Sequence, residues 1–119
     1  MSTELSGGNA IRPYRTSDRD QVIELWNACG LTRPWNDPTA DIQRSLDTPT
    51  SEIFVFQEAD RITGSLMVGY DGHRGWMYYL AADPAQRGRG IAKALVAVAE
   101  DFLRGQGCPK VELMVRTDN

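Results

Sequence analysis

The stretch AADPAQRGRGIAKALV, residues 81–96, decides how the rest of the chain is interpreted, because it joins a proline-containing loop to a helix. Apolar residues recur at helical spacing from Ile91 to Phe102 and predict an amphipathic helix after the glycines. Glycines at a helix start let a ligand approach the backbone, and the first N–H groups of a helix have no intrahelical acceptor. The stretch therefore predicts a site for a phosphate or pyrophosphate, and the alternative is an ordinary solvated loop with a tight turn.

The composition is that of a small acidic domain. The chain has 119 residues and a formal net charge of -3, which gives no general basis for binding nucleic acid or an anionic membrane. No apolar run is long enough to cross a bilayer, and the first residues lack the pattern of a signal peptide. Cys29 and Cys108 have no metal-ligand spacing and are expected to be reduced thiols, which favours a cytoplasmic protein. Because His73 is the single histidine, sites built from several histidines are excluded, and no metal is predicted.

Turn residues divide the chain into alternating elements. Residues 1–10 are polar and rich in glycine, so we expect a flexible leader before a single domain over residues 11–119. Asp37 and Pro38 predict a helix start, as N-cap and first helical residue, and Gly64 predicts a bulge or bend inside a strand. The expected order is β-α-α-β-β-β-α-β, with strands at 11–14, 53–57, 62–70, 76–82 and 111–115 and helices at 18–29, 38–48 and 91–104.

The glycine motif and its setting resemble the GNAT family of N-acetyltransferases. Residues 87–92, RGRGIA, match that family's R-x-x-G-x-G/A signature, and residues 79–84, YLAADP, look like the end of its fourth strand and the following loop. The segments LTRPWNDP, GYDGHRG and GCPK further resemble the YpeA-like bacterial subgroup. The resemblance implies an α/β (α+β) GNAT fold with a mixed, mostly antiparallel sheet flanked by helices. It also implies a chain that stops before the family's last helix and last two strands.

By this resemblance the chain binds acetyl-CoA. The backbone of the strand end is expected to hydrogen-bond to the pantetheine arm, and the amides of the glycine motif to bind the pyrophosphate. The strand-end residues are Leu80, Ala81 and Ala82. The motif residues are Arg87, Gly88, Arg89, Gly90, Ile91 and Ala92. Asn119 matches an asparagine where the family's next helix begins, and it completes the expected cofactor site.

Three residues are candidates for the acid–base chemistry, and each has a structural alternative. Asp37 borders the acceptor site by resemblance, but it also fits the role of N-cap before Pro38. His73 could accept a proton at neutral pH, or be an exposed histidine in a turn. Tyr78 and Tyr79 are expected to point to opposite faces of their strand, one toward the core and one toward the substrate, and Tyr78 is the catalytic candidate.

The predicted function is transfer of an acetyl group from acetyl-CoA to a primary amine of a small molecule or peptide. The alternative is a non-catalytic CoA-binding or regulatory module, because the family's C-terminal catalytic elements do not appear in the sequence. No nucleic acid or membrane is expected as a partner. The apolar strand at 111–115 would be an unpaired edge, which would allow a homodimer.

Overall fold

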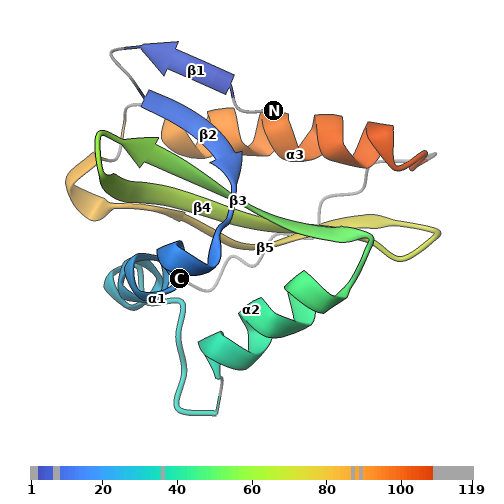
Figure 1. Cartoon of the computed structure of the whole chain (residues 1–119), viewed down its shortest axis with the longest axis horizontal. Helices are drawn as coiled ribbons and strands as arrows, with labels where there is room; N and C mark the ends of the chain where they lie inside the picture. The colour runs from blue at the N-terminus through green and yellow to red at the C-terminus, as the bar shows by residue number, and fades with distance from the viewer. Residues whose placement is uncertain (1–2, 7–8, 36, 87, 89, 109–119) are drawn as a thin grey trace.

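The computed structural model describes residues 3–6, 9–35, 37–86, 88 and 90–108. The strands are β1 (Thr3–Ser6), β2 (Asn9–Pro13), β3 (Ser51–Glu58), β4 (Arg61–Tyr70) and β5 (Gly75–Ala82). The helices are α1 (Arg19–Ala28), α2 (Pro38–Asp47) and α3 (Ile91–Gly105), with 3-10 turns η1 (Thr16–Asp18) and η2 (Pro84–Gln86). The described strands form one antiparallel sheet in the order β1-β2-β3-β4-β5. Helix α3 covers one face of this sheet, and α1 and α2 cover the other (Figure 1).

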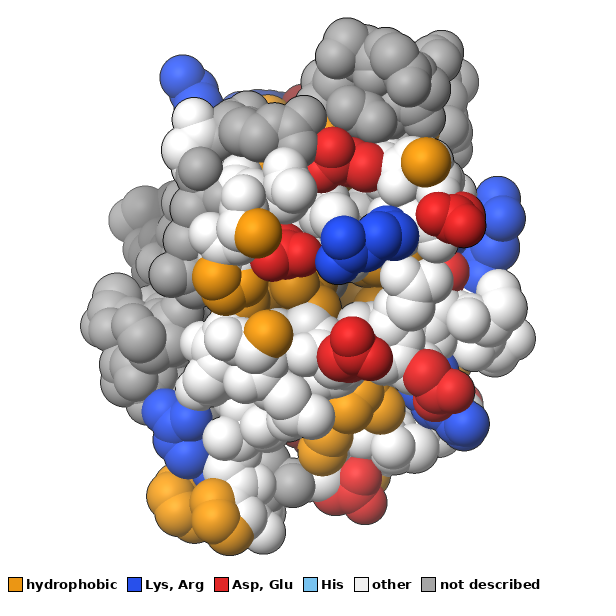
Figure 2. Space-filling view, turned by 90° about the vertical axis from the view of Figure 1, so that its left-hand side faces the viewer, with side chains coloured by type: hydrophobic (Ala, Val, Ile, Leu, Met, Phe, Trp, Pro, Cys, Tyr) orange, Lys and Arg blue, Asp and Glu red, His pale blue; other side chains and the backbone are white. Residues whose placement is uncertain are grey.

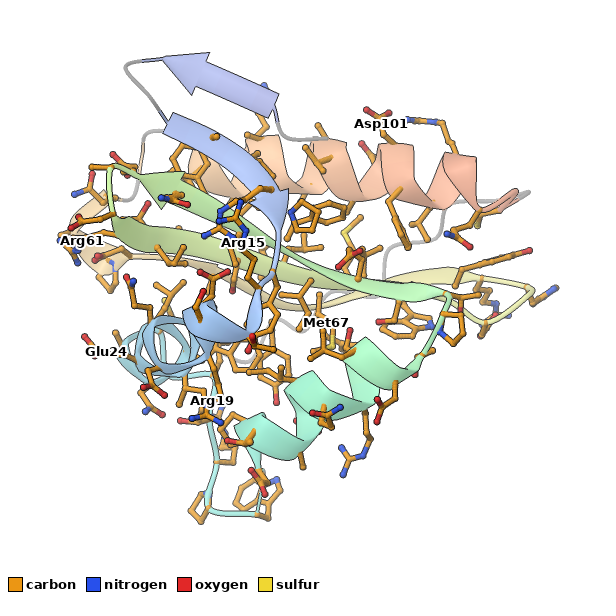
Figure 3. The ribbon with its side chains drawn as sticks, viewed as in Figure 1. Arg15, Arg19, Glu24, Arg61, Met67 and Asp101 are labelled. Carbon is orange, nitrogen blue, oxygen red and sulfur yellow. The ribbon has the colours of Figure 1, made fainter. Side chains whose placement is uncertain are left out.

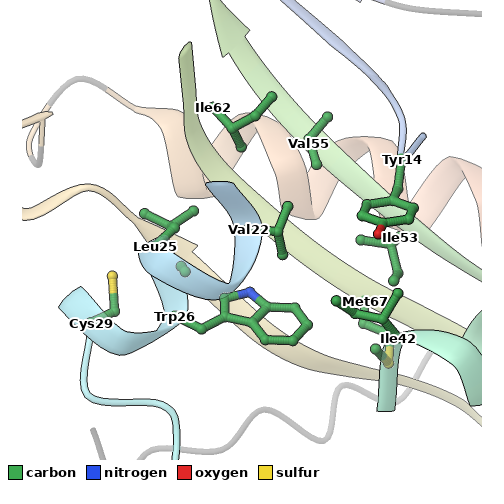
Figure 4. Close-up of a cluster of buried hydrophobic side chains, with 11 residues drawn as sticks. Tyr14, Val22, Leu25, Trp26, Cys29, Ile42, Ile53, Val55, Ile62 and Met67 are labelled. Carbon is green, nitrogen blue, oxygen red and sulfur yellow. The ribbon is translucent and has the colours of Figure 1, made fainter. Parts of the chain in front are cut away.

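Alternation along the strands divides the apolar residues between two cores. Ile53 and Val55 of β3 belong to the core under α1 and α2. Phe54 and Phe56 of the same strand belong to the core under α3. The first core gathers around Trp26, whose side chain is fully buried (Figure 4). Because helices cover both faces of the sheet, β4, which lies between β3 and β5, is buried along nearly its whole length.

Helix α3 approaches β4 closely because β4 carries Gly64 beneath the first turn of the helix. A Cβ atom at Gly64 would lie 2.5 Å from Cγ2 of Ile91 and 3.1 Å from Cδ1 of Leu95. The missing side chain therefore sets the position of the N-terminus of α3 relative to the sheet. The β3–β4 pairing shifts register beside Gly64, between Phe56 and Gln57, so the predicted bulge is confirmed.

An ion pair ties β2 to the start of α1. Nη1 of Arg12 donates to Oδ2 of Asp18 at 2.7 Å, and only 12% and 7% of these side chains are exposed. Burial by itself would raise the pKa of the Asp18 carboxyl. The hydrogen bonds from Arg12 and from the backbone N–H of Arg15 outweigh burial and hold that pKa below its usual value. The pair is therefore ionised near neutral pH, and it fixes β2 against α1.

The N-terminal part of the fold differs from the sequence prediction. The expected strand at 11–14 is β2, which begins at Asn9, and β1 pairs with it through Thr3 opposite Ile11. Within the expected leader over residues 1–10, Thr3–Ser6 pair as a strand along the edge of β2, and the flexibility of the leader stays a prediction. The three helices and the strands β3, β4 and β5 are confirmed, with shifts at their ends. The expected strand at 111–115 lies outside the described residues.

The surface of the described part carries mixed charge. Figure 2 shows the side of the molecule that lies at the left of Figure 1, and acidic and basic side chains are interspersed on it. Arg61, which lies at this side (Figure 3), donates to Asp83 at 3.3 Å. Among the described helices, none combines the length and the apolar character needed to cross a membrane.

Candidate active site

The N-terminus of α3 is preceded by glycines in the left-handed backbone region. The angle φ is +87° at Gly88 and +81° at Gly90, which is the N-cap of α3. A Cβ atom at either position would project into open space, so it is the backbone conformation that favours glycine. The N–H of Ala94 donates to the carbonyl oxygen of Gly90 at 3.0 Å. The N–H groups of the first turn, before Ala94, have no acceptor within the helix. This end of α3 therefore presents backbone donors and the positive end of the helix dipole to an anion.

A cavity of about 590 Å³ lies next to this helix end, and we call it the β5–α3 cleft. Its lining residues are Ala28, Cys29, Gly30, Leu80, Ala81, Ala82, Pro84 and Ala92. These side chains are mostly small, so a ligand can approach the backbone. In the described sheet β5 is an edge strand, and alternate N–H and C=O groups of such a strand point away from its neighbour, where an extended ligand can pair with them. The thiol of Cys29 donates to the carbonyl oxygen of Ala82 at 3.2 Å, which holds the end of α1 against the end of β5.

Strand β5 contains a bulge at Tyr79. Its φ is +54°, and the β4–β5 pairing passes from Met67 opposite Tyr78 to Ser65 opposite Ala81, with one more residue on β5 than on β4. The extra residue resets the alternation of side chains. Tyr78 and Tyr79 consequently both pack against the core under α1 and α2. The prediction that they point to opposite faces is therefore wrong.

A buried chain of hydrogen bonds holds this bulge. Nε1 of Trp26 donates to Oγ of Ser65 at 2.7 Å, and that hydroxyl donates to the carbonyl oxygen of Tyr79 at 3.2 Å. The rings of Trp26 and Tyr79 stack, with centroids 3.8 Å apart and planes inclined by 11°. Trp26 and Ser65 are fully buried, so the carbonyl of the bulge finds its partner inside the protein. Helix α1 thereby fixes the conformation of β5 beside the cleft.

A second cavity, of about 350 Å³, lies between α2 and β5, and we call it the α2–β5 cavity. Its lining residues are Leu31, Arg33, Asp41, Arg44, Ser45, Thr48, Ser51, Met67, Trp76, Met77, Tyr78, Tyr79 and Leu80. Met67 points into this region from β4 toward α2 (Figure 3). The carboxylate of Asp41 accepts hydrogen bonds from the Tyr79 hydroxyl and from Arg44, so Tyr79 joins the bulge to α2. Leu80 lines both cavities, so both adjoin β5 next to the bulge.

The predicted cofactor residues that the structure describes gather around one cleft. Those that line the β5–α3 cleft are Leu80, Ala81, Ala82 and Ala92. Gly88 and Gly90 form the turn that leads into α3. The side chain of Ile91 is buried in the core under α3, so only its backbone can reach a ligand. The predicted residues that fall outside the described part are Arg87, Arg89 and Asn119.

The structure separates the three catalytic candidates. Tyr78 lines the α2–β5 cavity. Asp37 is the N-cap of α2 and accepts from the backbone N–H of Ala40 at 3.2 Å, and it is not part of the cavity lining. His73 is exposed in the turn between β4 and β5, outside the described lining of both cavities. Hydrogen bonds from the backbone N–H groups of Arg74 and His73 hold the pKa of Asp71 in this turn below its usual value, as in a structural turn. Catalytic roles for Asp37 and His73 stay predictions.

The sequence did not indicate two charged side chains, Asp41 and Arg44, that line the α2–β5 cavity. Asp41 and Arg44 are three residues apart on α2, a spacing that is typical of any solvated helix surface. The contact between Asp41 and the Tyr79 hydroxyl joins residues 38 positions apart. No local pattern signals such a contact, because it depends on how α2 packs against the bulged strand.

The fold, the N-terminus of α3 preceded by glycines, and the two cavities beside β5 agree with one known class of protein. A model described as the acetyltransferase (GNAT) family matches residues 19–119, and the chain belongs to this family. An acetyltransferase of Sodalis glossinidius (strain morsitans) is 51% identical over 109 residues, which cover 92% of this chain and 77% of that relative. The predicted family, fold class and enzyme type are confirmed.

Two solved structures show how widely the fold is shared. An acetyltransferase of Trypanosoma brucei is 26% identical and superposes with a TM-score of 0.72, over 92% of this chain and 84% of that one. The structure of AAC(6')-Iy in complex with the bisubstrate analogue CoA-S-monomethyl-acetylneamine superposes with a TM-score of 0.79, over 95% of this chain and 83% of that one. Its identity of 17% makes this second likeness one of fold.

Proposed function

We propose that this chain is an acetyl-CoA-dependent N-acetyltransferase that acts on a primary amine of a small molecule or peptide. The observation that carries the proposal is the position of Leu80, which lines both the β5–α3 cleft and the α2–β5 cavity. A donor in the first space and an acceptor in the second would meet at this residue. Bringing two reactants together in this way can account for a large part of an enzymatic rate.

The β5–α3 cleft is the proposed site of acetyl-CoA. The pyrophosphate would lie at the N-terminus of α3, where Gly90 leads into the helix. The pantetheine arm would run along β5, at the edge of the described sheet, past Ala82 and Ala81, toward Leu80. The complex of AAC(6')-Iy with a CoA-containing bisubstrate analogue supports this assignment, because that protein shares the fold.

The proposed reaction is direct transfer between the two substrates. The lone pair of the neutral amine forms a bond to the acetyl carbon, the carbon–sulfur bond breaks, the amine loses a proton, and the CoA thiolate takes one up. A backbone N–H of Leu80 or Ala81 is the proposed donor to the developing oxyanion, because the bulge at Tyr79 reorients the backbone at this point. Tyr78 is the proposed proton-transfer residue, since it lines the cavity assigned to the amine. Membership of the YpeA-like subgroup is a further part of the proposal.

The test is an amine-dependent transfer assay. We expect thiol release from acetyl-CoA that requires both the protein and an amine from a panel of small amines and peptides, with the acetylated amine identified by mass spectrometry. Acetyl-CoA with protein alone is the control for hydrolysis. Saturable CoA binding without amine-dependent thiol release would instead favour the non-catalytic module.

A further inference from the structure

The hydroxyl side chains of the α2–β5 cavity already have partners within the protein. Oγ of Ser45 and Oγ of Ser51 are 2.7 Å apart, and Ser51 also donates to the carbonyl oxygen of Val68 at 3.1 Å. The Thr48 hydroxyl donates to the carbonyl oxygen of Arg44 at 2.6 Å. Because these hydroxyl groups already donate their hydrogens, they offer no donor to the oxygen atoms of a hydroxyl-rich substrate, which would lose hydration here.

Apart from the charged residues Arg33, Asp41 and Arg44, the remainder of the lining is apolar and aromatic. The ring of Trp76 lies over Gly69, so closely that it fills the space of a Cβ atom at that glycine. The Trp76 ring also contacts the ring of Tyr78, with centroids 4.8 Å apart. Leu31 and Met67 complete the apolar surface between α2 and the sheet. Rings that are held by packing on both sides form a firm wall for a compact apolar group.

One carboxylate lies in this lining, on α2. The side chain of Asp41 is 26% exposed and accepts from the Tyr79 hydroxyl and from Arg44. A carboxylate has more acceptor sites than these two bonds use, so Asp41 can also accept from an ammonium group. Arg44 donates to this carboxylate through Nη1, and its side chain is otherwise 74% exposed. The cavity therefore pairs an aromatic interior with one carboxylate that can accept from an amine.

We propose that the acceptor is a primary amine carried by a compact apolar body of about the size of one aromatic ring. This inference rests on the proposed function, because it names the substrate class of the same site. The cavity volume of about 350 Å³ suits a small ligand of this kind. The apolar body lies against Trp76, Tyr78 and Met67, and the amine approaches Asp41 before it reaches the acetyl group near Leu80.

The test compares three amines on the full chain: 2-phenylethylamine, glucosamine and spermidine. We expect the kcat/KM for 2-phenylethylamine to exceed that for either of the others by at least about tenfold, since burial of a ring against apolar side chains favours it. The Trp76→Ala variant should reduce this preference several-fold and leave the dissociation constant for acetyl-CoA unchanged. Leu46→Ala, an exposed apolar residue of α2 outside the described lining, is the control and should keep the preference.

The outcomes separate the inference from the proposed function. Equal or faster acetylation of glucosamine or spermidine would overturn the inference and leave acetyl transfer standing. The order of the kcat/KM values of the wild-type protein for the three amines needs no variant. It therefore tests the inference even if Trp76→Ala folds poorly. If the protein acetylates none of the three amines and no amine of a wider panel, the proposed function is contradicted, and the inference fails with it.

Discussion

Replacing Gly90 by valine is expected to raise the dissociation constant for acetyl-CoA about 100-fold, which corresponds to about 2.8 kcal/mol. Gly90 has a φ of +81° and is the N-cap of α3. A β-branched residue is strained in this conformation, and relief of the strain would turn the N–H groups of the first turn away from the pyrophosphate. Hydrogen bonds from those groups to a charged phosphate are each worth about 1.5–3 kcal/mol, so loss of one or two accounts for the effect. Calorimetric titration with acetyl-CoA measures it.

Gly107→Val is the matched control. Gly107 follows the opposite end of α3, has a φ of +80°, and has open space around a Cβ atom, so the backbone strain is the same. Both variants should lose similar thermal stability, but Gly107→Val should bind acetyl-CoA as the wild type does. Equal affinity of Gly90→Val and wild type, or an equal loss in both variants, would contradict the assignment of the cofactor to this helix end.

Ser65→Ala is expected to lower the free energy of unfolding by about 2–4 kcal/mol. The change removes the hydroxyl between Trp26 and the Tyr79 carbonyl, and both groups are left in the interior without this partner. Each buried polar group that loses its partner costs about 1–3 kcal/mol. Urea denaturation measures the loss. Because the bulge beside Leu80 loses its support, the rate of acetyl transfer should fall more than the affinity for acetyl-CoA.

Two variants make the result specific to the buried chain of hydrogen bonds. Ser17→Ala alters an exposed serine in η1 and should change stability by less than about 0.5 kcal/mol. Trp26→Phe removes the indole donor but keeps an aromatic ring against Tyr79, and the Ser65 hydroxyl can still donate to the bulge carbonyl. It should therefore reduce the transfer rate less than Ser65→Ala does. Stability of Ser65→Ala equal to that of Ser17→Ala would show that the hydroxyl does not hold the bulge.

The helix start at the proposed donor site could be predicted from the sequence because its determinants are local. Glycines that turn the chain into a helix lie within a few residues of each other, and the N-cap position and φ of Gly90 follow from that pattern. Asp37 followed by Pro38 likewise predicted the start of α2, which the structure confirms. The order of helices and strands could be predicted for the same reason, since periodicity and turn residues are properties of short segments.

The α2–β5 cavity, which is the proposed acceptor side, could not be predicted, because it depends on contacts between segments that are far apart in the sequence. A bulge at Tyr79 requires the paired strand and the Ser65 hydroxyl, and neither is apparent from alternation within residues 76–82. The simple two-residue period therefore assigned Tyr78 and Tyr79 to opposite faces, whereas both face α1 and α2. Strand β1 was missed because its residues are polar, and pairing with β2 orders the backbone without an apolar signal.

Tyr79 lies between the two halves of the proposed site, the β5–α3 cleft and the α2–β5 cavity. Its carbonyl is held by Ser65, its ring stacks on Trp26, and its hydroxyl binds Asp41 in the α2–β5 cavity. A single residue thus sets the backbone next to the proposed thioester and the wall next to the proposed amine.

The most direct measurement of the central claim is a map of backbone amide shifts in isotope-labelled protein as acetyl-CoA is added. The account predicts that the largest changes fall on Gly88, Gly90 and Ala92 at the start of α3 and on Leu80 and Ala82 at the end of β5. Amides near the β1–β2 pair and the C-terminal end of α3 should change little. Saturable shifts that leave the start of α3 and the end of β5 unaffected, or no shifts at all, would contradict the claim that this cleft holds the acetyl donor.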